Sequence, residues 1–420
     1  MKGKYLYSYL KNPNINKPIK EIWDDYDLYT GEYFADEEWL HGKIDLMVPL
    51  PPMQYKGKFV KGLFLTQAAD FLLSKYPDIK KLFHVGAYTM CSSYSWCENA
   101  DLYFACYENK EREAYYKSKY PNKKDIIFLP LQDADLTNEY HIAPSFNTPK
   151  TIDVLMVATP YEVKNHFMLA KALKIYEQKY GQRLNTTCIF GLNEVKKNRK
   201  GEYDFSSLST TSQGILKELN EILDNDINKY INIIPRVPYK DLSKYYTSAK
   251  CVVLTSLIEG KNRSLNEAMS CDTPIVVFKQ LNQYVRGEED IIYENSGEYA
   301  EEFTPEALAE AIHKVIANQD KYEPRRSYLK NNGRTNFINK CAKYIPYYQE
   351  NIPEYEEGRF HENSWVNLAV QKNYQISYHD FLYDKAQHLS WVQGTERIDY
   401  LIKFYYSLFG INTTKLTEVL

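Results

Sequence analysis

The hydrophobic pattern of residues 251–278 predicts a strand, a helix and a second strand. The runs at 251–254 and 275–278 are short, apolar and without alternation, which is typical of strands buried on both faces of a parallel sheet. Between them, Ser264 stands three residues before Glu267, the spacing of a capping box at a helix start. The apolar side of this helix carries Leu265, Ala268 and Met269. We therefore expect one βαβ unit here.

The same patterns recur along the chain and predict an α/β fold with parallel sheets. Further strands are expected at 4–10, 44–50, 82–85, 102–106, 126–129, 152–158, 186–190 and 231–235. Further helices are expected at 62–76, 109–120, 164–180, 212–223, 241–248 and 305–316. Residues 12–40 are predicted to be an irregular insertion. Residues 288–302 carry seven acids and no base, and are predicted to be a solvated loop.

The length of 420 residues suits two domains plus an extension. A proline-marked polar segment at 146–150 is typical of a linker. We expect one α/β domain at 1–148, a second at 149–343, and an aromatic, helical extension at 344–420. No G-x-G-x-x-G sequence follows a predicted strand of the first domain, so a dinucleotide-binding role for that domain is disfavoured.

Composition limits the partners and the compartment. Lysine and arginine number 52 against 55 acidic residues, a net charge of −3, so no global positive field favours nucleic acid. The seven cysteines form no C-x-x-C pair and are expected to be reduced thiols of a cytoplasmic protein. No signal-peptide pattern and no run of about eighteen apolar residues occurs, which leaves peripheral membrane contact open.

Two carboxylates stand at fixed places in the 251–278 unit. Glu259 lies on the loop that leaves the carboxyl end of a strand, the edge where doubly wound sheets bind ligands, and Glu267 follows eight positions later in the helix. The backbone amides of 262–265 begin that helix and favour an anion such as a diphosphate. In the alternative interpretation, Glu267 only closes the capping box and Glu259 is a solvated loop residue.

Glu259-Gly260, seven residues, Glu267-Ala268-Met269 and then Thr273-Pro274 together resemble the donor-site signature of retaining nucleotide-sugar glycosyltransferases of the GT-B fold (group 1, or glycogen-synthase-like). The resemblance runs from about 152 to 340. It implies two Rossmann-like domains facing across a cleft, an acceptor-side first domain, and a C-terminal helix that packs back on it. It also implies that the first Glu contacts the transferred sugar and the second the ribose, with the diphosphate on the amides between them. The donor-binding residues implied are Lys164, Gly260, Asn262, Ser264, Leu265 and Glu267, with Glu259 catalytic. We add Arg263 to the expected donor-binding residues, although it departs from the family pattern.

Three departures from that pattern concern the diphosphate and the turn after the helix. Asp272 replaces the usual glycine, and aspartate tolerates the left-handed backbone that this turn needs. Lys164 matches the family's phosphate-binding lysine, but Ala158 or Thr159 occupies the position of its arginine. We expect Arg263, in an unusually cationic loop, to replace that arginine.

His84 is a second candidate catalytic residue. It is predicted at the end of the strand at 82–85, where it opens a small-residue loop at 87–95. The resemblance implies a histidine that faces the transferred sugar across the cleft. The alternative is an ordinary strand-end histidine.

The function expected from the resemblance is transfer of a sugar from a UDP- or GDP-sugar to a carbohydrate or lipid-linked acceptor, with retention of configuration. No cofactor or metal is expected, because no Asp-x-Asp motif follows a predicted strand. One alternative is a viral-type enzyme that glycosylates nucleic-acid bases, which only the cluster Lys117, Lys119, Lys123 and Lys124 favours. The other is a non-catalytic binding protein on a degenerate GT-B fold, which the missing arginine favours.

Overall fold

The structure is a computed structural model of the chain. It describes residues 45–66, 68–89, 99–105, 118, 128–130, 137, 139–140, 142–192, 195–197, 203–257, 259, 262–283, 291–355, 391–393 and 395–411. The predicted strand at 4–10, the insertion at 12–40 and, apart from residue 118, the helix at 109–120 lie outside these residues. So do Gly260 and the lysine cluster of residues 117–124.

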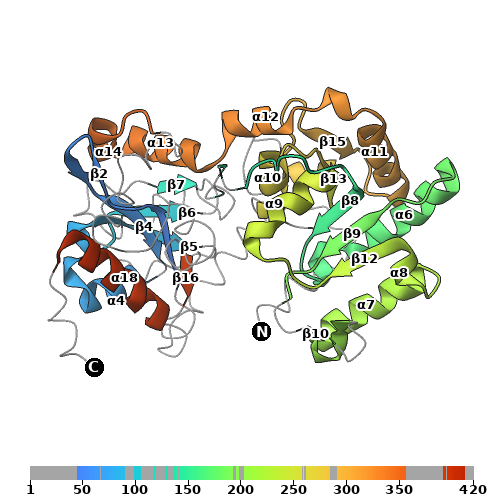
Figure 1. Ribbon diagram of the computed structural model, residues 1–420, viewed down its shortest axis with the longest axis horizontal. Coiled ribbons are helices and arrows are strands. Elements are labelled where there is room, and N and C mark those ends of the chain that lie inside the picture. The colour runs from blue at the N-terminus through green and yellow to red at the C-terminus, as the bar shows by residue number, and fades with distance from the viewer. Residues whose placement is uncertain are drawn as a thin grey trace. The chain divides into compact units, whose positions relative to one another are not determined.

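The described chain divides into two compact units, each built on a six-stranded sheet (Figure 1). The first contains the described residues up to Tyr140 together with those from Arg334 onward, and the second contains those from 142 to Gly333. Both sheets contain parallel strands joined through helices, so the predicted α/β class is confirmed.

The sheet of the second unit is entirely parallel and doubly wound. Its strands are β8 (Ile152–Val157), β9 (Thr186–Ile189), β12 (Ile231–Ile234), β13 (Ala249–Leu254), β14 (Ile275–Phe278) and β15 (Gly297–Ala300). They lie in the order β12-β9-β8-β13-β14-β15. Because the chain winds outward in both directions from the centre, the strand order reverses between β8 and β13. Such switch points hold the ligand crevice of doubly wound folds.

Helices cover both faces of this sheet. They are α6 (His166–Tyr180), α7 (Thr210–Ile222), α8 (Ile227–Tyr230), α9 (Tyr239–Ser248), α10 (Arg263–Ser270), α11 (Pro305–Ala317) and α12 (Pro324–Asn331). Figure 1 shows α9 and α10 on one face, while α11 packs against α6 and lies over β13 and β14 on the other. Short 3₁₀ turns occur at Glu162–Lys164 (η3), Phe205–Ser207, Lys279–Gln283 and Gln319–Lys321, and β10 (Lys196–Lys197) pairs with β11 (Tyr203–Asp204).

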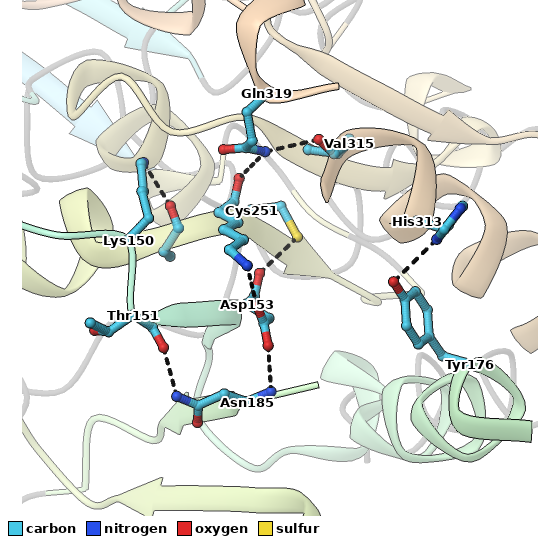
Figure 2. Close-up of polar contacts among 11 residues, drawn as sticks. Lys150, Thr151, Asp153, Tyr176, Asn185, Cys251, His313, Val315 and Gln319 are labelled. Atoms are coloured by element: carbon cyan, nitrogen blue, oxygen red, sulfur yellow. Dashed lines mark hydrogen bonds and ion pairs between the residues drawn. The ribbon is translucent and has the colours of Figure 1, made fainter. Parts of the chain in front are cut away.

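Polar contacts fasten the amino-terminal edge of this sheet (Figure 2). The Asp153 carboxylate accepts the Asn185 backbone N–H at 2.7 Å and pairs with Lys250 at 2.7 Å, which ties β8 to the starts of β9 and β13. The Asn185 side-chain amide donates to the Thr151 carbonyl at 2.6 Å, and Lys150 donates to the Ala249 carbonyl at 2.7 Å. These polar groups bond to one another, so we assign a structural role to the amino-terminal edge. The carboxyl edge is where sheets of this kind bind ligands.

The sheet of the first unit is mixed. Its strands are β1 (Asp45–Leu50), β4 (Gly62–Thr66), β5 (Phe83–Thr89), β6 (Leu102–Ala105), β7 (Phe128–Pro130) and β16 (Trp391–Gln393), in the order β16-β1-β4-β5-β6-β7. Strands β4 to β7 are parallel, and β1 is antiparallel to both neighbours. The other elements are the hairpin β2 (Met53–Tyr55) and β3 (Lys58–Val60), η1 (Pro77–Lys81), and the helices α4 (Ala69–Lys75), α13 (Arg334–Tyr344), α14 (Pro346–Asn351) and α18 (Thr395–Phe409).

The end of the chain belongs to this first unit. Besides the pairing of β16 with β1, the buried Tyr348 hydroxyl donates to the Gly62 carbonyl at 2.6 Å. The Tyr76 hydroxyl donates to Asp399 of α18 at 2.8 Å. These contacts join residues about three hundred positions apart, so the carboxyl-terminal helices are part of the core of the first unit.

Two sequence predictions about elements are wrong. The helix predicted at 62–76 is a strand over Gly62–Thr66 and a helix only from Ala69, because every residue of β4 is buried between β1 and β5. The loop predicted at 288–302 contains the edge strand β15 at its end. Gly297 allows that strand to approach β14, since a Cβ there would lie 2.0 Å from the Ile275 carbonyl oxygen.

Candidate functional site

The switch point of the second unit brings together two loops. The loop after β8 carries Lys164 in the short turn η3, and the loop after β13 carries Glu259. The Lys164 ammonium and the Glu259 carboxylate form an ion pair, with side chains 21% and 11% exposed. The lysine and the first glutamate singled out in the sequence are therefore in direct contact at the carboxyl edge of the parallel sheet.

Backbone and hydroxyl contacts hold these loops to each other. The Leu257 N–H donates to the Val163 carbonyl at 2.8 Å, and the buried Thr255 hydroxyl donates to the Lys164 carbonyl at 3.0 Å. Asn165 adopts a left-handed conformation (φ 48°) and turns the chain from η3 into α6. The position of Lys164 is therefore fixed by the main chain on both of its sides.

Ser256 orients the carboxylate of Glu259. Its buried hydroxyl donates to Glu259 Oε1 at 2.6 Å, the same oxygen that contacts Lys164. Glu259 Oε1 therefore accepts one bond from the neutral Ser256 hydroxyl and one from the charged Lys164 ammonium. Hydrogen bonds that involve an ionised group are stronger than those between neutral groups.

Helix α10 begins differently from the capping box predicted at Ser264. Asn262 is the N-cap, and its side-chain oxygen accepts the Leu265 N–H at 3.2 Å and the Ser264 hydroxyl at 2.6 Å. The prediction was wrong because asparagine is an equally good cap and stands two residues earlier, which moves Glu267 into the second turn. The Leu265 amide is already bonded, so fewer amides than expected face an anion.

Glu267 is buried, with only 3% of the residue exposed. The Tyr246 hydroxyl of α9 donates to its Oε2 at 2.7 Å. Burial raises the pKa of the Glu267 carboxyl, while the nearby charge of Arg263 and the tyrosine bond act to lower it. Its second oxygen, Oε1, has no hydrogen-bond partner among the described residues.

Arg263 is the first residue of α10 and is half-buried. It lies close enough to Glu267 for its charge to act on the pKa of that carboxyl. At the position where the resemblance expects an arginine, Ala158 is 8% exposed, and its carbonyl accepts the His166 ring N–H at 3.2 Å. Burial lowers the pKa of His166 to about 4, so this imidazole is neutral at pH 7. The cation that the resemblance expects at this position is therefore absent, and Arg263 stays the prediction for that role.

His84 does not lie at the carboxyl edge of its sheet. Strand β5 continues to Thr89, so the predicted position at a strand end is wrong and His84 stands near the amino end of β5. Its ring packs against Tyr347 and Tyr348, with centroid distances of 4.9 and 5.3 Å, and burial lowers its pKa. This packing favours the alternative interpretation, that of an ordinary strand histidine.

Of the predicted donor-binding residues, the structure gathers Lys164, Asn262, Arg263, Ser264, Leu265 and Glu267 with Glu259 around one edge of the second unit. Sequence reasoning missed Thr255, Ser256 and Tyr246. The first two directly follow a predicted strand, and their position was a usable signal. Tyr246 gave none, because its bond to Glu267 depends on how α9 packs against α10.

Among the described residues, no cluster of three or more histidine, cysteine, aspartate or glutamate side chains could hold a metal ion. No helix within the same residues is long and apolar enough to cross a membrane.

Comparisons with known proteins bear on this site. Residues 137–336 match the model of the family Glycosyl transferases group 1. No curated protein sequence matches the chain.

Solved structures similar to this chain include the following three. Sucrose-phosphate synthase from Thermosynechococcus elongatus is 16% identical, with coverage of 59% of this chain and 58% of that one and a TM-score of 0.42. A glycosyltransferase from Rickettsia africae is 13% identical, with coverage of 67% and 80% and a TM-score of 0.46. Anabaena Alr3699/HepE, solved with UDP and glucose, is 13% identical, with coverage of 58% and 62% and a TM-score of 0.38. The chain thus spans less than two thirds of the length of the synthase and of HepE.

The matched segment contains Lys164, Glu259 and Glu267, and it includes the doubly wound sheet that places them. Two α/β units, the second of them Rossmann-like, are consistent with the GT-B fold. The similarity to the family Glycosyl transferases group 1 is thus confined to residues 137–336, the part of the chain that contains the switch point.

Proposed function

We propose that this protein is a glycosyltransferase that binds a nucleotide sugar at the switch point of its second unit and transfers the sugar to a carbohydrate or lipid-linked acceptor. The observation that carries the proposal is the Lys164–Glu259 ion pair between the loops after β8 and β13. A parallel doubly wound sheet binds its ligands at this place, and the family match covers both loops.

The site offers cations for a diphosphate. Lys164 and Arg263 approach from different elements, and the amino terminus of α10 adds the positive end of a helix dipole. As the bond between the sugar and the phosphate breaks, negative charge grows on the leaving diphosphate, and preorganised positive groups stabilise that charge. In the proposed mechanism, Lys164, Arg263 and the amino terminus of α10 supply the positive charge, and no cofactor or metal is needed.

Glu259 has a second role in this account. In the free protein it neutralises Lys164, and the diphosphate of an incoming donor competes for the same ammonium group. Glu259 is then free to accept a hydroxyl of the sugar, the contact that the resemblance implies. Retention of the anomeric configuration and a UDP- or GDP-linked donor are also parts of the proposal that come from the resemblance. A cytoplasmic location is a further part of the proposal, and it rests on the cysteine pattern.

A non-catalytic binding protein on the same fold is the second candidate. It is favoured by Ala158 and Thr159, which place no cation where the family has an arginine. The two candidates agree on nucleotide binding and differ only in turnover.

Hydrolysis of a donor without acceptor tests the proposal and separates the two candidates. UDP- and GDP-linked hexoses and pentoses are incubated with the protein, and the sugar released by attack of water at the anomeric carbon is followed by proton NMR. We expect slow release from one donor, with the first-formed sugar in the donor's own anomeric configuration, and its loss in Glu259→Gln. Tight donor binding without release would favour the binding protein.

A further inference from the structure

Ser256 contacts the ion pair of the site without being one of its two members. We propose that Ser256 is a positioning residue: its hydroxyl keeps Glu259 in place when a bound diphosphate takes Lys164 away from that carboxylate, and the affinity for the diphosphate therefore depends on Ser256. This inference rests on the proposed function, because it concerns the same lysine and the same ligand.

Glu259 has two donors at one oxygen. Its Oε1 accepts the Ser256 hydroxyl at 2.6 Å and also contacts the Lys164 ammonium. The Glu259 side chain is 11% exposed, and Ser256 has no exposed surface. A diphosphate attracts the ammonium by its charge, whereas the enclosed, neutral hydroxyl offers it no such attraction. The two donors should therefore part when the ligand binds, and Ser256 should be the one that stays.

The main chain on both sides of Ser256 is fixed to the other loop of the site. The Thr255 hydroxyl donates to the Lys164 carbonyl at 3.0 Å, and the Leu257 N–H donates to the Val163 carbonyl at 2.8 Å. These bonds use main-chain carbonyl groups of the loop after β8 and not the lysine side chain. The ammonium can therefore change partners while the Ser256 hydroxyl stays where it is.

The departure of Lys164 leaves a carboxylate that is mostly enclosed by protein. An ionised group in such a place costs free energy unless hydrogen bonds satisfy it. With Lys164 on the ligand, the Ser256 bond is the described contact that still satisfies Oε1. Loss of the Ser256 hydroxyl should therefore cost more in the ligand-bound protein than in the free protein, where the ammonium still neutralises Glu259. The result is weaker binding of the diphosphate.

The test measures diphosphate affinity on the full chain by calorimetry. UDP, GDP and ADP are titrated into the wild-type protein, and the one that binds most tightly is then titrated into Ser256→Ala. We expect its Kd to rise by on the order of fivefold to tenfold, because a hydrogen bond to a charged group is lost mainly from the bound state. Thermal unfolding of the unliganded proteins checks that Ser256→Ala folds.

A double-mutant cycle with Glu259→Gln shows whether Ser256 acts through the carboxylate. A glutamine has no charge to leave unpaired, so Ser256→Ala should change the Kd little when Glu259→Gln is already present. A serine with a merely structural role would weaken binding by the same factor in both backgrounds. The ratio of the two factors therefore separates a positioning role from a structural one.

Ser296→Ala is the matched control. Ser296 is also a serine of the second unit with no exposed surface, and its hydroxyl donates to the Tyr293 carbonyl at 2.9 Å, just before the edge strand β15. Its loss should lower stability and leave the Kd unchanged. Ser256→Cys, which keeps the shape but donates weakly, replaces Ser256→Ala if that variant does not fold, and its Kd should rise as well.

The remaining outcomes separate the two proposals. An unchanged Kd in Ser256→Ala, with a wild-type protein that binds a nucleoside diphosphate, would overturn the inference and leave the proposed function in place. An equal rise in Kd with and without the Glu259 carboxylate would do the same. A folded wild-type protein that binds none of the three diphosphates would overturn the proposed function together with the inference.

Discussion

Lys164 and Glu259 are 95 positions apart in the sequence and form an ion pair at the carboxyl edge of the second sheet. The contact joins the loop after β8 to the loop after β13, on the two sides of the switch point. Each residue therefore neutralises the other, and we propose that the negative charge of a ligand competes with Glu259 for Lys164.

The two glutamates are expected to fail in different ways. Glu259→Gln should lower turnover more than donor binding, whereas Glu267→Gln should mainly weaken nucleotide binding, each on the order of tenfold to a hundredfold. Steady-state kinetics and calorimetry measure the two effects. Glu301→Gln, which removes an exposed partner of Lys279, is the control and should change neither. Normal kinetics in both site variants would leave these glutamates with structural roles only.

Arg263 is expected to hold the diphosphate with a two-point contact that lysine does not reproduce. Arg263→Lys should therefore reduce kcat/KM, and Arg263→Ala should reduce it further, with the fold intact. Because Lys164 is proposed to bind the same diphosphate, Lys164→Ala and Arg263→Ala should combine non-additively. Additive losses would mean that the two cations contact different parts of the ligand.

The cap of α10 should matter to both stability and binding. Asn262→Ala removes the acceptor of the Leu265 N–H and should cost roughly 1 kcal/mol of unfolding free energy. Thr304→Ala removes a comparable cap on α11, where the threonine hydroxyl accepts the Ala307 N–H at 3.2 Å. Urea unfolding should show similar losses for both variants, while only Asn262→Ala weakens donor binding. If Thr304→Ala weakens binding equally, the effect belongs to stability and not to the site.

His166 should make the protein less stable in acid. Its pKa is about 4 in the folded chain and about 6.5 in the unfolded chain, so below pH 6.5 the unfolded state takes up a proton that the folded state refuses. Between pH 7 and pH 5 this costs about 2 kcal/mol of unfolding free energy. His166→Gln lacks the titration, so its stability should fall by that much less over the same range. Parallel curves for the two proteins would show that the ring is not held neutral.

Much of the second unit could be predicted from the sequence because its strands are buried on both faces. Buried parallel strands appear as short apolar runs, and the runs at β8, β9, β12, β13 and β14 were found in this way. Asp272 was also expected to be left-handed and has φ 59°. By contrast, β4 was predicted to be helical, because a fully buried run of five residues suits either structure, and only its neighbours decide.

The site was predictable where a motif fixed the spacing and not where packing decides. The spacing of Glu259 and Glu267 and the position of Lys164 follow from the chain itself. The cap at Asn262 was missed because asparagine and serine are both good caps, and the choice depends on where the loop enters the helix. The bond from Tyr246 to Glu267 depends on two helices meeting, which no local pattern encodes.

The central claim is that the switch point of the second unit binds a nucleoside diphosphate through Lys164. Its most direct test is calorimetric titration of UDP, GDP and ADP into the wild-type protein, Lys164→Ala, and Lys279→Ala as a control for loss of an exposed lysine. We predict that at least one of the three binds the wild type and the control alike, and that its Kd rises tenfold or more in Lys164→Ala. No binding to the folded wild type, or an unchanged Kd in Lys164→Ala, would contradict the account.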